Sequence, residues 1–178
     1  MLLSAVALTA CKGNAAISKP DHWVRTDTTS KISDTPGVTF TTESPDKGDT
    51  SHPVLQIGCE NGKSFVSIYP DTLSTLSPDD TDIEGGRAYK DITWRLGNAP
   101  AEKTRVLIGL NSDASMLGWW GSDAETTARK LAGVTQLVIQ FDNLEHMGAQ
   151  SSYEFSFDTS GLDGKLAELT KTCKWPPA

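Results

Sequence analysis

Leu55-Gln56-Ile57-Gly58-Cys59-Glu60-Asn61-Gly62-Lys63 is the stretch that decides the fold, together with Val66 and Ile68 just beyond it. Its apolar residues alternate with other residues, so they share one face of an extended strand, and the same period returns after residue 63. Asn61 and Gly62 both tolerate the positive φ that a primed two-residue turn needs. The stretch therefore predicts an antiparallel hairpin with one buried face.

The same period of two recurs along most of the chain. Val38 and Phe40 alternate with threonines. Further strands are predicted at residues 89–96, 105–110, 115–120, 135–141 and 151–157. Loops are predicted at residues 44–53 and 74–86, which are rich in Pro, Gly, Ser, Thr and Asp. We expect residues 22–178 to form a single, mainly β domain, an antiparallel β-sandwich.

Two segments have helical spacing instead and are expected to pack on the sheet, at about residues 122–133 and 160–173. Ser122 and Glu125 match a capping box, and Gly133 stands where a helix end often takes a positive φ. Thr159 or Ser160 is the expected cap of the second helix. Its apolar residues recur at intervals of three and four, which places Cys173 on the buried face.

The first residues end in Leu8-Thr9-Ala10-Cys11, after a short apolar run. This pattern resembles a bacterial lipoprotein signal, in which Cys11 receives the lipid. Residues 1–10 would then be the signal peptide and residues 11–21 a flexible tether. An ordinary signal-peptide fragment and a buried strand are the alternatives. No other stretch approaches the ~18 apolar residues of a spanning helix, so the lipid is the expected membrane anchor.

The chain has three cysteines. Assigning Cys11 to the lipid leaves Cys59 and Cys173 as one disulfide in an exported protein. Two buried free thiols are the alternative.

The net charge of -7 argues against nucleic acid or anionic lipid as a partner. Gly62-Lys63-Ser64 ends like a phosphate-binding loop, but Ile57 stands where that loop needs glycine. The common hydrolase motifs are missing from the sequence. His22 and His52 are predicted in loop or strand-edge positions, and His146 in the loop after the strand that ends at Phe141. An enzyme would need one of them beside a carboxylate in a deep pocket. We predict no catalytic residue and no cofactor.

Residues 79–84 are acidic, and Asp80, Asp82, Glu84 and Asp91 have the spacing of calcium ligands in a helix-flanked loop. The flanking pattern is β rather than helical, so a solvated acidic loop is expected, with no metal. Its Asp79, Asp80, Asp82 and Glu84 are candidate partner-binding residues.

Trp119 and Trp120 are the other candidates. Adjacent residues of a strand point to opposite faces, so one tryptophan is expected in the core. The other is expected under a loop, or exposed as an anchor for a protein partner or a sugar.

Several of these motifs together resemble the type VI secretion-associated accessory proteins of the TagO/VasI kind. The matching stretches, in order, are Trp23-Val24-Arg25, residues 30–34 with Val38, residues 55–63, Ile92-Thr93-Trp94-Arg95-Leu96, Phe157-Asp158-Thr159-Ser160-Gly161-Leu162 and Cys173-Lys174-Trp175. The resemblance implies an exported β-rich domain and no catalytic residues.

Taken together, the sequence predicts a non-enzymatic binding protein, lipid-anchored on the periplasmic side of the bacterial envelope. Lys12 after the lipid cysteine resembles the outer-membrane pattern. Its partner would be another envelope or secreted protein. The alternative is a periplasmic immunity or inhibitor lipoprotein that blocks a toxin or a cell-wall hydrolase.

Overall fold

The computed structural model describes residues 21–47, 51–70, 75–76, 82–85, 87–111, 114–146 and 149–176. Cys11, Asp79 and Asp80 lie outside these ranges, as does almost all of the predicted tether. The predictions for the signal peptide and the lipid therefore remain predictions.

The described strands form one antiparallel sheet in the order β1-β2-β3-β4-β9-β8-β7-β10-β11, with β5 beside β10 and β6 beside β7. Their bounds are β1 Val24–Thr29, β2 Pro36–Glu43, β3 Val54–Glu60, β4 Lys63–Tyr69, β5 Thr75–Leu76, β6 Asp82–Glu84, β7 Arg87–Leu96, β8 Glu102–Asn111, β9 Ala114–Trp120, β10 Gln136–His146 and β11 Ala149–Asp158. All of the strands predicted from alternation are present.

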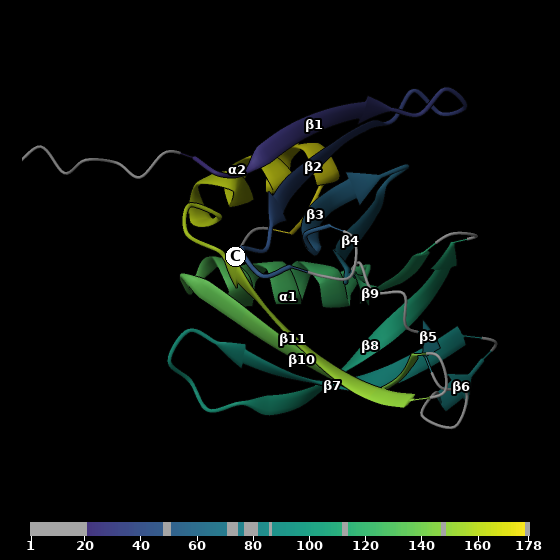
Figure 1. Cartoon of the computed structure of the whole chain (residues 1–178). Coiled ribbons are helices and arrows are strands. Elements are labelled where there is room, and N and C mark those ends of the chain that lie inside the picture. Colours follow the sequence, from purple (N-terminus) through teal and green to yellow (C-terminus); the bar gives the residue numbers. More distant parts are fainter. Residues whose placement is uncertain are drawn as a thin grey trace, which may run out of the picture.

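The sheet bends over so that its two halves face each other (Figure 1). There β1 to β4 form the upper layer and β7, β10 and β11 the lower layer, while β9 and β8 connect them. The interior holds apolar side chains from both layers, including Phe40, Ile57, Ile139 and Phe157. The predicted mainly β, antiparallel architecture with two helices is confirmed, and its facing layers belong to one continuous sheet.

The β3–β4 hairpin forms as predicted. Glu60 pairs with Lys63, and the turn residues Asn61 and Gly62 have φ values of 52° and 72°. Leu55, Ile57, Cys59, Val66 and Ile68 are all buried on its inner face.

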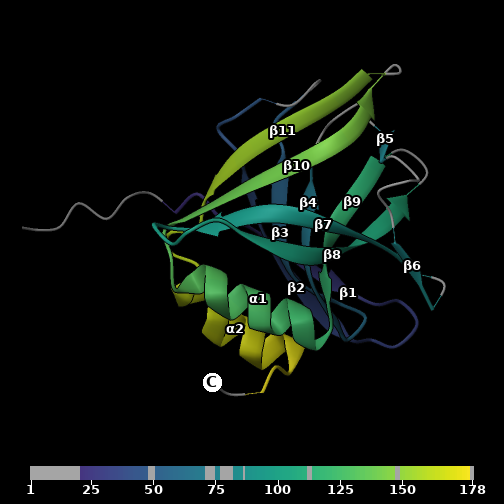
Figure 2. The ribbon, with the colours of Figure 1, turned by 90° about the horizontal axis from the view of Figure 1, so that it is seen from below.

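Two helices, α1 Ser122–Ala132 and α2 Asp163–Cys173, lie next to each other along one side of the molecule (Figure 2). α1 packs on β4 and β9, and α2 packs on β2 and β3. Both therefore cover the inner face of the upper layer. α2 begins at residue 163, three residues later than predicted.

The predicted caps are wrong. Gly121 is the N-cap of α1, with no side-chain hydrogen bond, and the Glu125 carboxylate accepts a hydrogen bond from Ser64 instead. Gly133 has φ -80°, because backbone hydrogen bonds to α1 carbonyls end this helix in a right-handed conformation.

At α2, the N-cap is Leu162. Thr159 and Ser160 are not caps, because their hydroxyls already donate to the Val134 carbonyl and to the Asp158 carboxylate.

Cys59 of β3 and Cys173 at the end of α2 form a disulfide with a Cα–Cα distance of 5.6 Å, as predicted. Two residues later, the indole Nε1 of buried Trp175 donates to Ser64 Oγ at 2.6 Å. The C-terminal helix is thus fastened to β3 covalently and to β4 by a buried hydrogen bond.

Candidate functional site

The two adjacent tryptophans lie on opposite faces of β9, as predicted. Trp119 is buried and packs against Trp94, with ring centroids 5.3 Å apart. Trp120 is half-buried and stands beside Phe65 of β4 on the outer face, which is the side of the sheet away from the helices. Trp119 is thus a core residue, and Trp120 remains available to a partner.

Trp120 borders a hollow on the outer face, which we call the outer groove, with a volume of about 360 Å³. Its aromatic and apolar lining is Phe65, Tyr69, Met116 and Trp120; its neutral polar lining is Thr26, Thr39, Thr41, Gln56 and Ser67; and its one charged residue is Glu60. These side chains come from β1 to β4 and from β9. Because β9 follows β4 in space but not in sequence, only the folded sheet brings them together.

Two glycines allow neighbouring strands to approach closely along this groove. A Cβ on Gly58 would lie 2.2 Å from the Val38 carbonyl oxygen, and one on Gly118 would lie 2.1 Å from the Val66 carbonyl oxygen. Gly58 pairs with Phe65, and Gly118 pairs with Ser67. Backbone of the neighbouring strand therefore occupies the space of a side chain at both positions, which hollows the face between the aromatic residues.

Ser67 lies between Phe65 and Tyr69 on the same face of β4. The residue is 1% exposed, and its hydroxyl has no hydrogen-bond partner among the described residues. A buried hydroxyl without a partner costs free energy, so this group marks a place where a ligand could supply one.

A second hollow, the basic hollow, is also bordered by Trp120 and has a volume of about 510 Å³. Its lining comprises Gly62, Lys63, Ser64, Arg87, Leu107, Trp120, Gly121 and Glu125. Glu125 accepts a hydrogen bond from Ser64 at 3.2 Å, and Ser64 in turn accepts the one from Trp175. The carboxylate is thus held in place beside two basic side chains, Lys63 and Arg87.

The acidic candidates Asp82 and Glu84 lie on β6, in a region predicted to be a loop. Both carboxylates are 3.4 Å from the guanidinium of Arg105, which also stacks over Tyr89. Arg105 therefore offsets part of their charge. Asp91 lies on β7 opposite Arg105 in the β7–β8 pairing and is exposed.

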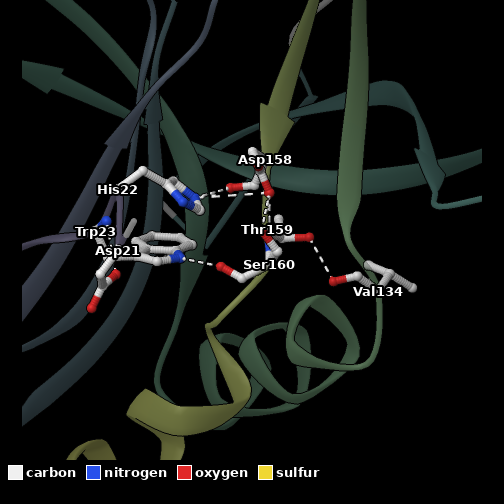
Figure 3. Close-up of polar contacts among 7 residues, drawn as sticks. All are labelled: Asp21, His22, Trp23, Val134, Asp158, Thr159 and Ser160. Atoms are coloured by element: carbon white, nitrogen blue, oxygen red, sulfur yellow. Dashed lines mark hydrogen bonds and ion pairs between the residues drawn. The ribbon is translucent and has the colours of Figure 1, made fainter. Parts of the chain in front are cut away.

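His22 lies beside a carboxylate, the arrangement that an enzyme would need (Figure 3). Its Nε2 donates to the Asp158 carbonyl oxygen at 2.8 Å and is 3.9 Å from Asp158 Oδ1. The Ser160 hydroxyl and backbone N–H both donate to that Oδ1. Because the serine bonds to the aspartate rather than to the histidine, the geometry lacks a nucleophile–base pair.

The His22–Asp158 contact and two neighbouring ones fasten residues 21–23 to the end of β11 and to α2. Trp23 is buried, and its indole Nε1 donates to the Ser160 carbonyl oxygen at 3.0 Å. Asp21, next to it, pairs with Lys165 of α2, and this hydrogen bond lowers the pKa of the Asp21 carboxyl. Figure 3 shows this cluster joining residues that are far apart in the sequence.

His52 and His146 come from other parts of the fold. His52 Nδ1 lies 3.1 Å from the Asp46 carbonyl oxygen in the loop after β2. His146 ends β10, so its predicted loop position is wrong; β10 continues past Phe141 through a bulge and pairs again with β11.

Two negative findings apply to the described ranges alone. There, no three His, Cys, Asp or Glu side chains gather closely enough to hold a metal ion. Within the same ranges, neither helix has the length and apolar character needed to cross a membrane.

The comparisons with known proteins concern the fold. No family model and no curated protein matches the chain. The crystal structure of invasion associated protein B from Bartonella henselae superposes with a TM-score of 0.52 and 8% sequence identity, covering 86% of this chain and 95% of that one. At this identity, the similarity establishes a shared fold alone.

Trp120 is identifiable from the sequence, but the groove around it is not. Phe65, Ser67 and Tyr69 alternate with the buried Val66 and Ile68, so their common outer face could have been read from the sequence. Their position beside Trp120 depends on the β4–β9 pairing, which the alternation does not indicate.

Proposed function

We propose that the protein is a non-enzymatic accessory protein of the bacterial envelope that acts by binding another envelope or secreted protein. Its similarity in sequence motifs to the TagO/VasI kind of type VI secretion-associated proteins supports this role. A lipid on Cys11 would hold it on the periplasmic side, at the outer membrane. Such tethering raises the local concentration of the binding site near the membrane, so modest affinity suffices.

The observation that carries the proposal is the basic hollow. It combines a half-buried tryptophan, an exposed arginine and the apolar side chain of Leu107 in one concavity. Trp and Arg are the residue types that most often dominate the energy of protein interfaces. The chain as a whole carries a charge of -7, so Lys63 and Arg87 form a local basic spot. A partner would dock with an apolar side chain near an acidic group.

The inhibitor alternative would use the acidic residues 79–84. It receives less support, because Arg105 already pairs with both Asp82 and Glu84.

The test is affinity capture from envelope extracts with the oxidised full chain as bait, followed by mass spectrometry. The wild type is compared with Arg87→Glu/Lys63→Glu. Ile32→Ser is the matched control, because Ile32 is 99% exposed in the turn between β1 and β2, outside both hollows. We expect secretion-machine proteins to be captured by the wild type and the control, and lost with the charge-reversed variant. Capture of a toxin or a cell-wall hydrolase would refute the accessory role and favour the inhibitor.

Anchoring is tested separately by labelling cells with a radioactive fatty acid. The wild type should incorporate the label and Cys11→Ser should not.

A further inference from the structure

We propose that the outer groove is a binding site for an uncharged oligosaccharide. This site is additional to the basic hollow and independent of its protein-docking role. The chemistry of the lining, the shape of the floor and one buried hydroxyl all favour such a ligand.

The polar lining is neutral and can both donate and accept hydrogen bonds. Thr39, Thr41 and Ser67 offer hydroxyls, and Gln56 offers an amide. A saccharide presents hydroxyls that also donate and accept, so each contact can form in either direction. Glu60 at the same groove can accept from two hydroxyls. It would repel an anionic ligand, as would the overall negative charge.

The aromatic residues stand at the two ends of this polar floor. Phe65 and Trp120 lie side by side at one end, and Tyr69 lies at the other. Tyr69 is four positions beyond Phe65 on the extended strand, which corresponds to roughly 13 Å. Aromatic rings offer flat apolar surfaces, which suit the C–H faces of sugar rings, while the hydroxyls at the edges of those rings reach the floor. The groove thus has room for more than one sugar.

An added peptide strand is a poorer fit. Strand addition needs free backbone groups at a sheet edge. The floor instead lies in the middle of the sheet, where β3 is paired with both β2 and β4, and β4 with both β3 and β9. Recognition must therefore come from side chains.

Ser67 gives the sharpest support. Its hydroxyl is buried on the groove face and has no partner within the described part of the chain. A purely apolar occupant would leave this group unsatisfied, whereas a sugar hydroxyl that displaces the side chains covering it would complete it. The serine thus lowers the stability of the free protein and contributes to ligand binding.

The test uses uncharged soluble tetrasaccharides of β1,4-linked N-acetylglucosamine and β1,4-linked glucose, together with purified cell-wall sacculi. Calorimetry and tryptophan fluorescence measure binding of the soluble sugars to the oxidised full chain, and co-sedimentation measures binding to the sacculi. Binding of soluble sugars alone would indicate a free oligosaccharide as ligand, and binding of sacculi as well would indicate cell-wall glycan. We expect Gln56→Ala and Trp120→Ala each to weaken binding about tenfold.

Ser67→Ala separates a binding role from a structural one. We expect it to weaken sugar binding about fivefold while leaving the unfolding midpoint unchanged or raised, because it removes a buried polar group without a partner. A lower midpoint with unchanged affinity would overturn the role of Ser67. Arg87→Glu and Ile32→Ser should leave sugar affinity unchanged.

Absence of binding to all three probes at millimolar sugar would overturn the proposal. So would binding that survives Gln56→Ala and Trp120→Ala in folded protein. If Gln56→Ala and Ser67→Ala instead abolish capture of a protein from envelope extracts, the groove is a protein site and the saccharide proposal is wrong. Loss of protein capture with Arg87→Glu/Lys63→Glu alone would leave the saccharide site intact.

Discussion

Opening the Cys59–Cys173 disulfide should lower the free energy of unfolding by about 3–5 kcal/mol. The bridge joins positions 114 residues apart. In the chain-entropy model, closing a loop of this length removes about 5 kcal/mol of conformational freedom from the unfolded chain, and measured values commonly fall below the model. A typical domain has only about 5–15 kcal/mol of net stability, so the loss would be a large part of the total.

The assay is urea unfolding followed by tryptophan fluorescence, for the oxidised wild type, the reduced wild type and Cys59→Ser/Cys173→Ser. The reduced wild type isolates the cross-link, because both buried thiols stay in place. The double variant adds two buried hydroxyls, so we expect it to be the least stable of the three. Reductant should not change its curve, which controls for effects of the reagent.

The slope of the unfolding curve tests whether the cross-link acts on the unfolded chain. A cross-link acts mainly on the unfolded chain, so its removal should let that chain expand, expose more surface and raise the m-value. Equal midpoints and equal slopes for oxidised and reduced protein would refute the argument. A lower midpoint with an unchanged slope would place the effect in the native packing of α2 on β3.

Two further predictions concern a carboxylate and a glycine. Hydrogen bonds from the Ser156 hydroxyl and N–H, both 2.7 Å long, hold the pKa of the Asp46 carboxyl below its usual value. The stability that this carboxylate contributes is therefore present above about pH 4 and lost as the pH falls through the folded-state pKa. The difference in stability between wild type and Asp46→Asn should shrink over that acid range, and parallel curves would contradict the assignment. Gly118→Ala should cost about 1–3 kcal/mol, since its Cβ meets the Val66 carbonyl oxygen at 2.1 Å. Gly164→Ala is the control, because Gly164 lies in α2 and has open space where its Cβ would stand; this variant should be neutral or stabilising by up to about 1 kcal/mol. Equal losses of stability in the two variants would refute the close-contact argument.

Strands with one buried face could be predicted from sequence, because burial imposes a period of two. Val66 and Ile68 are fully buried, and their alternation was sufficient to place β4. β1 was missed for the opposite reason. It is an edge strand with exposed side chains, held by backbone pairing to β2, so no apolar period marks it. The short β6 has the same character, with all of its side chains exposed.

The helix caps were mispredicted because local sequence patterns compete with tertiary partners. Glu125 could have reached back to its own helix start, but Ser64 of β4 donates to it instead. Threonine is a residue type that often caps helices, yet the Thr159 hydroxyl donates to the Val134 carbonyl oxygen. Val134 is close to it only in the folded chain. Such contacts cannot be read from a local window of sequence.

The groove and the hollow could be predicted only in part, because they depend on the order of strands across the sheet. Trp120 was found from the alternation of β9. Phe65 and Gln56 join it because β9 crosses to lie beside β4, which the linear order of the chain does not reveal.

The motifs behind the resemblance to TagO/VasI proteins hold the architecture together. Trp23 donates to Ser160, Trp175 donates to Ser64, and Cys59 is bonded to Cys173. Each contact joins distant parts of the chain and is buried or nearly so, and side chains in such positions serve packing more than recognition. Ser67, Arg87 and Trp120 lie outside these motifs, while Gln56 and Lys63 belong to the stretch 55–63 but line the groove and the hollow rather than making these fastening contacts. Two proteins could therefore share these fastening residues and bind different partners, so a test of function must vary the lining of the groove and the hollow rather than Trp23, Trp175 or the disulfide.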